Sequence, residues 1–215
     1  MKRTILSLSV AALLWFVMFS PWTAPHIDFW ATMSFSAAVL CILSFRFGSV
    51  GHRFRGAGPQ DLLTGIVSAA ALWGIFWIGN YLSTRWFGFA QAQVGAIYSM
   101  KEGHDPALVA LLLLVLIGPA EEIFWRGYIQ NRIRDFVRSH RPGLGSTAVT
   151  LTSVALTAAI YSLVHVWSFN FMLVMASLVC GVFWGLLYAF GRSLPTTVLS
   201  HALWDAAVFI IFPIH

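Results

Sequence analysis

The sequence predicts an all-α protein, a polytopic bundle of about seven membrane-spanning helices. Its 215 residues are 59% hydrophobic and only 10% charged, whereas a soluble domain carries about 25% charged residues. The apolar residues also fall into runs of about 20, the length of helix that crosses a bilayer. The net charge of +5 could suggest nucleic acid, but in a membrane protein it reflects topology. The predicted partner is therefore the lipid bilayer, with no nucleic acid.

Seven segments are apolar enough to span a membrane. They are, approximately, residues 4–20, 29–47, 62–82, 107–128, 147–167, 171–190 and 196–213. The first follows Met1-Lys2-Arg3 without an obvious cleavage site, so we interpret it as an anchor rather than a signal peptide. Residues 83–106 are too long for a turn and too mixed to span, which favours an interfacial helix followed by a loop.

The basic residues predict the orientation of these spans. With the N-terminus in the cytoplasm, eleven of them lie in inside segments: Lys2, Arg3, Arg46, Arg53, Arg55, Arg126, Arg132, Arg134, Arg138, Arg141 and Arg192. Only Arg85 and Lys101 lie outside. This positive-inside bias supports an odd number of spans. The expected location is a cell membrane, crossed several times, and specifically a bacterial inner membrane.

Small residues and cysteines within the spans are interpreted as packing features. Gly181 and Gly185 form a small-xxx-small pair, which allows two helices to approach closely. Cys41 and Cys180 both lie in apolar runs, so no disulfide is predicted.

Three carboxylates and two imidazoles lie inside apolar runs. They are Glu121, Glu122, His165, His201 and Asp205. A charge at the bilayer centre costs roughly 3 kcal/mol even on the mildest insertion scale, so such groups are functional candidates by default.

The spacing of these groups predicts which of them share a helix face. Glu122 and Arg126 are four residues apart and are expected to pair. Glu121 points about 100° away from that pair. It is either a reactive group or a structural bond to a neighbouring helix. His201 and Asp205 also share a face, where the carboxylate either orients the imidazole or is protonated and donates a hydrogen bond.

Tyr161 and His165 have the same spacing. A lone histidine on an apolar helix is commonly a satisfied core residue, but a glutamate and a second histidine on other helices favour a functional role here. Pro119 lies one turn before the glutamates and frees the carbonyl of Val115. The resulting kink either admits water or substrate, or serves packing alone.

The depth of Glu121 decides whether these groups can meet. If the fourth span ended at Arg126, Glu121 would lie near one surface and His165 near the other. Apolar residues at helical spacing predict that this helix continues to about Arg138, which places Glu121 near mid-depth. The stripe consists of Tyr128, Ile129, Ile133, Phe136 and Val137.

Three chemistries fit this set of residues. A carboxylate and an imidazole can activate water as a general base, while a second imidazole stabilises an oxyanion. One glutamate and two histidines could instead ligate zinc, although the HExxH spacing is absent. A proton relay in a transporter is a third possibility, but we find no internal repeat of the kind common in transporters.

The motifs resemble those of the CAAX-protease and bacteriocin-processing (CPBP, or Abi) family, which includes the type II CAAX prenyl endopeptidases. EEIFWRG resembles its EExxxR motif, YSLVH its FxxxH motif, and HALWD its Hxxx(N/D) motif. The three occur in the family's order, each on its own helix. The resemblance covers about residues 106–213, so we divide the single membrane domain into N-terminal spans with an interfacial segment (1–105) and a catalytic helical core (106–215).

The resemblance implies a glutamate-dependent intramembrane endopeptidase without an obligatory metal. Glu121 would activate water together with His165, Glu122 and Arg126 would form a structural pair, and His201 with Asp205 would stabilise the oxyanion. Tyr161 replaces a phenylalanine, and Asp205 stands where asparagine is common. An ionised aspartate cannot donate to an oxyanion, so Asp205 is either protonated or orients His201.

The expected substrate is a peptide or protein in or at the membrane, and no cofactor is expected. Two alternatives stay open at this point. One is a zinc peptidase that uses the same residues. The other is a non-enzymatic transporter or scaffold.

Overall fold

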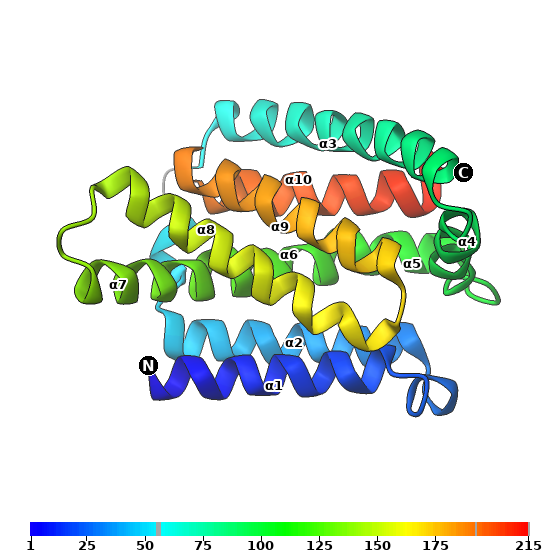
Figure 1. Ribbon diagram of the computed structural model, residues 1–215, viewed down its shortest axis with the longest axis horizontal. Helices are drawn as coiled ribbons and strands as arrows, with labels where there is room; N and C mark the ends of the chain where they lie inside the picture. Colours follow the sequence, from blue (N-terminus) through cyan, green and yellow to red (C-terminus); the bar gives the residue numbers. More distant parts are fainter. Residues whose placement is uncertain (55–56, 192, 215) are drawn as a thin grey trace.

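Helices run side by side through the whole of this computed structural model (Figure 1), which describes residues 1–54, 57–191 and 193–214. Within these residues, seven helices are long and apolar enough to cross a membrane. They are α1 (Lys2–Phe19), α2 (Phe29–Gly48), α3 (Pro59–Trp86), Pro106–His140, Ser146–Ser168, α9 (Phe171–Gly191) and Leu194–Ile211. The all-α, seven-span prediction is confirmed. Short helices η1 (Ala24–His26) and η2 (Gly51–Phe54) lie between the first three spans.

The fourth span is much longer than its apolar core. It runs without a break through α5 (Pro106–Leu112), η3 (Leu113–Ile117), α6 (Gly118–Glu122), η4 (Ile123–Gln130) and α7 (Asn131–His140). The span boundary near residue 128 was therefore wrong, and the predicted continuation of the helix to about Arg138 is confirmed, since α7 ends at His140. Ile133 and Val137 are buried on this extension, and Arg132 Nη2 donates to the Phe47 carbonyl at 2.8 Å.

Two π-helical segments flank the pair of glutamates. In η3, the Gly118 N–H donates to the Leu113 carbonyl, five residues back, immediately before Pro119. The wider turn accommodates the proline, which has no N–H to donate. Such π segments are rare and frequently occur at functional sites. The second segment, η4, is buried along its whole length.

The region between the third and fourth spans contains the expected extra helix. This helix, α4 (Ala90–Ser99), follows α3, which ends four residues later than the sequence indicated. In Figure 1 it lies at the right-hand end of the bundle, beside the start of α5. The loop after it ends at Asp105, whose carboxylate accepts from the Ala107 N–H at 2.7 Å and caps α5.

The remaining two spans complete the bundle. The fifth consists of α8 (Ser146–Leu163) and η5 (Val164–Ser168), and the last of α10 (Leu194–Ala206) and η6 (Ala207–Ile211). Helices from both halves of the sequence pack together, since α1 contacts η5, α2 contacts η4, and α3 contacts α10.

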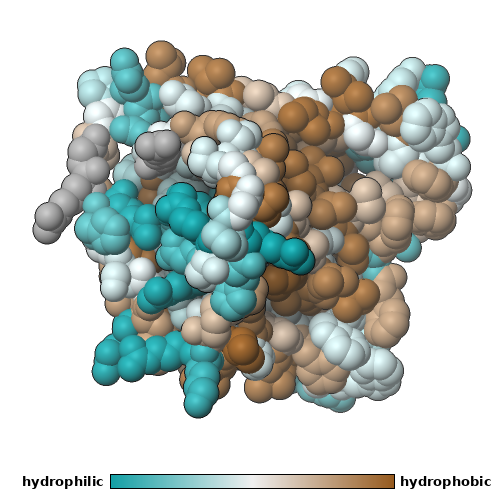
Figure 2. Space-filling model, turned by 60° about the vertical axis from the view of Figure 1, so that its left-hand side comes forward, coloured by the Kyte–Doolittle hydropathy of each residue, from teal (hydrophilic) through white to brown (hydrophobic). Residues whose placement is uncertain are grey.

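Most of the basic segments gather at one end of the bundle, here called the basic end. Figure 1 shows the N-terminus, η2 and the α7–α8 turn at its left-hand end, and the C-terminus at the opposite end, as an odd number of spans requires. Figure 2 turns that left-hand end forward and shows most of the hydrophilic side chains in view gathered there. Arg55 and Arg192, which contribute to the basic count, lie outside the described residues. That this end faces the cytoplasm stays a prediction.

Two glycines of α9 allow this helix to pack closely against α8. A Cβ on Gly181 would lie 3.0 Å from Ala158 Cα, and one on Gly185 would lie 2.9 Å from Val154 Cγ1. The close approach predicted for this pair is confirmed between α8 and α9. Cys41 and Cys180 are both free.

Gly118 gives the sharpest test of this packing. A Cβ there would lie 3.0 Å from Ala202 Cα and 3.1 Å from the Leu113 carbonyl oxygen, and neither backbone atom can rotate away. We expect Gly118→Ala to lower the free energy of unfolding in detergent by about 1–3 kcal/mol. Gly74→Ala is the control, because a Cβ there has no neighbour within 4 Å. If both substitutions have the same effect, α6 and α10 are not packed this closely.

Candidate active site

A buried ion-pair network joins α6, η4 and α10. Glu122 Oε1 accepts from Arg126 Nη1 at 2.7 Å and from His201 Nδ1 at 2.8 Å. All three side chains are buried, and Glu122 has no exposed surface. The pair expected from the spacing of Glu122 and Arg126 is present. The contact from Glu122 to His201 was not predicted, because no sequence spacing relates residues 79 positions apart.

The guanidinium of Arg126 reaches a second helix. Its Nη2 donates to the carbonyls of Cys180 and Gly181, at 3.2 and 3.4 Å. Its Cζ lies 5.2 Å from the centre of the Tyr161 ring and 5.5 Å from that of Trp184. Arg126 therefore holds η4, α8 and α9 around one charge, which makes it central to the packing of the site.

His201 lies between two carboxyl groups. Its Nδ1 bonds to Glu122. Its Nε2 lies 3.4 Å from Asp205 Oδ2, which is longer than a strong hydrogen bond. The imidazole stacks on Trp184 with ring centres 3.8 Å apart and planes 20° apart. Trp184 is fixed in turn by its indole N–H, which donates to Ser200 Oγ at 3.1 Å. The ring of His201 is thus held firmly on the Glu122 side and loosely on the Asp205 side.

Glu121 contacts α8, whereas Glu122 contacts α10, as expected from the angle of about 100° between the two side chains around the helix. Tyr161 Oη donates to Glu121 Oε2 at 2.8 Å. In the part of the chain that the structure describes, the other oxygen, Oε1, accepts no hydrogen bond. The side chain is 5% exposed. One oxygen is therefore held by a phenol, and the other is available to a water molecule or a substrate.

His165 bonds to neither Glu121 nor His201. Its Nδ1 lies 2.7 Å from the Tyr161 carbonyl, which can only accept, so Nδ1 carries the hydrogen. Its Nε2 then accepts from the indole N–H of Trp15 at 3.0 Å. Both ring nitrogens are occupied, and the imidazole is neutral in this arrangement. Trp15 belongs to α1, and its indole was not predicted because nothing local marks one tryptophan among ten.

The structure brings the predicted residues into two adjoining sets. One contains Glu122, Arg126, His201 and Asp205. The other contains Glu121, Tyr161 and His165. Pro119 lies one turn before both and makes none of the side-chain bonds. The described residues include no group of three His, Cys, Asp or Glu side chains placed to hold a metal ion.

A protein-family comparison covers this same region. Residues 103–207 match the family model described as type II CAAX prenyl endopeptidase Rce1-like. Over these residues, the chain is similar to the Rce1-like family. The match includes every side chain of the two sets and supports a CAAX-type membrane endopeptidase. No curated protein and no solved structure matches the chain significantly.

The first helices lie outside the residues that match the Rce1-like model. Trp15 lies outside the matched residues, yet it bonds to His165 inside them. The N-terminal spans therefore contribute to the site directly.

Proposed function

We propose that this protein is an intramembrane endopeptidase of glutamic type, which hydrolyses a peptide bond of a membrane-associated peptide or protein. The observation that carries the proposal is the buried Glu121 carboxylate, with one oxygen held by Tyr161 and the other without a hydrogen bond to any described residue. Beside it lies the Glu122–His201–Asp205 set, which has a donor available for developing negative charge.

Glu121 is the proposed general base. Its Oε1 takes a proton from water, and the resulting hydroxide attacks the carbonyl carbon of the scissile bond. The same carboxyl group then gives the proton to the leaving nitrogen, so the C–N bond breaks and the carboxylate is restored. His165 joins this step only when the Trp15 N–H leaves its Nε2, because a nitrogen that accepts one hydrogen bond has no second lone pair.

His201 is the proposed stabiliser of the oxyanion. The Nδ1–H group of His201 is bonded to Glu122. The other ring nitrogen, Nε2, faces Asp205 and is available to the substrate. At 3.4 Å, the bond from Nε2 to Asp205 is weak, so a developing oxyanion can replace it. In this role the imidazole carries a hydrogen on both ring nitrogens. Glu122 orients the ring through Nδ1–H, Asp205 faces Nε2–H until the substrate enters, and Nε2–H is the donor to the oxyanion.

The proposed mechanism needs no metal ion. The donor atoms most suited to zinc are engaged elsewhere, since His165 Nε2 accepts from Trp15 and His201 Nδ1 bonds to Glu122. Treatment of the purified, reconstituted protein with a chelator tests this. Activity should persist, and metal analysis should find less than one zinc per chain. Loss of activity with EDTA and its return with zinc would favour the zinc peptidase.

The proposed substrates are bacterial membrane peptides, such as leaders, signalling peptides or sorting tails, in an inner membrane. The first experiment compares native membranes that carry wild-type protein with membranes that carry Glu121→Gln. Mass spectrometry reads new peptide termini after equal accumulation has been checked. Termini present only with the wild type establish proteolysis and identify the substrate. Identical termini would refute the peptidase and favour transport or scaffolding.

Trp15→Phe tests the role of the bond to His165. The variant keeps an aromatic ring but removes the N–H donor, so His165 Nε2 becomes available. We expect cleavage to rise by about two- to tenfold, the range of one net hydrogen bond. In a His165→Ala background the same substitution should change nothing, which the double-mutant cycle measures. A fall in rate with Trp15→Phe would show instead that Trp15 positions His165.

A further inference from the structure

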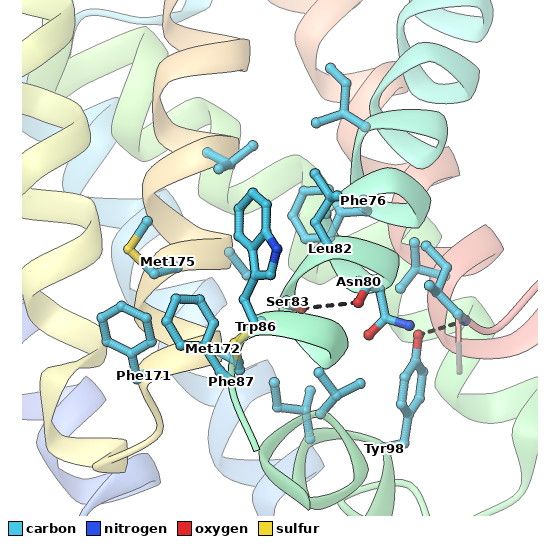
Figure 3. A pocket seen from close by; sticks show the side chains of 18 of the residues that line it. Phe76, Asn80, Leu82, Ser83, Trp86, Phe87, Tyr98, Phe171, Met172 and Met175 are labelled. Carbon is cyan, nitrogen blue, oxygen red and sulfur yellow. Dashed lines mark hydrogen bonds between the residues drawn. The ribbon is translucent and has the colours of Figure 1, made fainter. Parts of the chain in front are cut away.

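An apolar pocket lies beside the site, in the half of the bundle away from the basic end. Its volume is about 430 Å³, and it opens between α3 and α9, with α4 and η6 completing its walls. We call it the α3–α9 groove; its lining includes Phe76, Asn80, Trp86, Met175, Val179 and Val208. Figure 3 shows Met172 and Met175 on one side of Trp86 and Phe76 and Asn80 on the other, with Tyr98 of α4 below Asn80. The volume is in the range of sites that bind organic ligands.

The groove opens sideways, where a bilayer would surround the bundle. Trp86 at its mouth is 71% exposed, and Leu82, Met175 and Val179 are each more than a third exposed. An occupant can therefore enter from the hydrocarbon region without crossing water.

The inner end of the groove adjoins the proposed catalytic residues. Val179 precedes Cys180, whose carbonyl binds Arg126, and Val208 lies three residues after Asp205. Aromatic rings bridge the remaining distance. Phe76 lies 4.7 Å from Trp204, and Trp204 lies 5.5 Å from Trp184, which stacks on His201.

One polar atom in the groove identifies the chemistry of its occupant. Asn80 Oδ1 is covered by its neighbours and accepts no hydrogen bond from any residue that the structure describes, so it gains a partner when the amide turns toward an occupant of the groove. An acyl chain cannot pair with this oxygen. The backbone of an unwound peptide can, and within a bilayer its own N–H and C=O groups need such partners.

We propose that the α3–α9 groove binds an unwound, apolar segment of a membrane-embedded substrate and that Asn80 pairs with its backbone. This inference rests on the proposed endopeptidase function and assigns its substrate class. The substrate chain continues from the scissile bond into the half of the bilayer away from the basic end, so it is a membrane-spanning segment.

The test measures binding rather than cleavage. A photoreactive benzoylphenylalanine replaces Leu82 in the Glu121→Gln background, in liposomes of phosphatidylethanolamine and phosphatidylglycerol. The probes are two Leu/Ala-rich peptides of about 20 residues, the length of a span. One has three central glycines, which weaken the helix. We expect crosslinks to both peptides, with more to the glycine peptide.

Two variants locate the bound segment. Gly79 lines the groove, and a Cβ there has no neighbour within 4 Å, so Gly79→Leu adds side-chain volume to the groove without a clash at Cβ. It should reduce peptide crosslinking at least about tenfold, as when an occupied pocket is filled. Gly74→Leu on the same helix, also with no neighbour, should not. Asn80→Leu should lower the preference for the glycine peptide by about three- to tenfold, the value of one hydrogen bond.

The outcomes separate this inference from the proposed function. Crosslinks to phospholipid alone, or equal peptide crosslinks with Gly79→Leu, would overturn it and assign the groove to bilayer lipid. Substrate termini from wild-type membranes without peptide crosslinks would refute the groove and leave the endopeptidase standing. Peptide crosslinks without any wild-type cleavage would refute the endopeptidase, and with it the substrate assignment.

Discussion

Replacing Glu121 by Gln is expected to lower the rate of peptide cleavage by about 10²–10⁴-fold, the usual contribution of a general base. The amide keeps the size of the side chain, and its oxygen still accepts from Tyr161 Oη, so the site should remain assembled. What is lost is the basic oxygen, which takes the proton from water. The measurement is the turnover of a substrate identified by its new termini, with purified protein in liposomes.

Tyr161→Phe provides the matched control. It removes the hydrogen bond at 2.8 Å to Glu121 but leaves the carboxylate in place. We expect a smaller loss than with Glu121→Gln, about tenfold, because the net value of one hydrogen bond to a charged group is about 1.5–3 kcal/mol and only part of it is specific to the transition state. If Glu121→Gln retains full activity while Tyr161→Phe does not, Glu121 is not the base.

Arg126→Met should have the largest effect on stability, about 3–5 kcal/mol, because it leaves the Glu122 carboxylate buried without its main counter-charge. It also removes the bonds to the Cys180 and Gly181 carbonyls. Unfolding in detergent, followed by circular dichroism, gives the free energy change.

The double variant Glu122→Gln with Arg126→Met separates charge from packing. The amide oxygen of Gln still accepts from His201 Nδ1, and no unpaired carboxylate remains. Much of the lost stability should therefore return. A double variant that is no more stable than Arg126→Met alone would show that Arg126 acts through its packing against Tyr161 and Trp184.

The sequence by itself determined the spans and the groups within them. Runs of about 20 apolar residues have few stable alternatives in a bilayer, because each backbone N–H and C=O must be paired within the segment. Local spacing then determined the pairing of Glu122 with Arg126, since residues four apart share a helix face. The roles of Asp28 and Asp105 follow equally local rules, because each caps the helix that it precedes.

Tertiary structure alone decided which helices face one another. The contact of His201 with Glu122, the contact of Tyr161 with Glu121 and the indole of Trp15 on His165 all join separate helices. Between helices in lipid, packing and hydrogen bonds decide the partners, and no sequence period encodes them. The long fourth span depends on both the local sequence and the packing of helices. Its apolar stripe indicated a continuation to about Arg138. Only the packing of α7 and the π turns around Pro119 place Glu121 and Glu122 together with Tyr161 and His201.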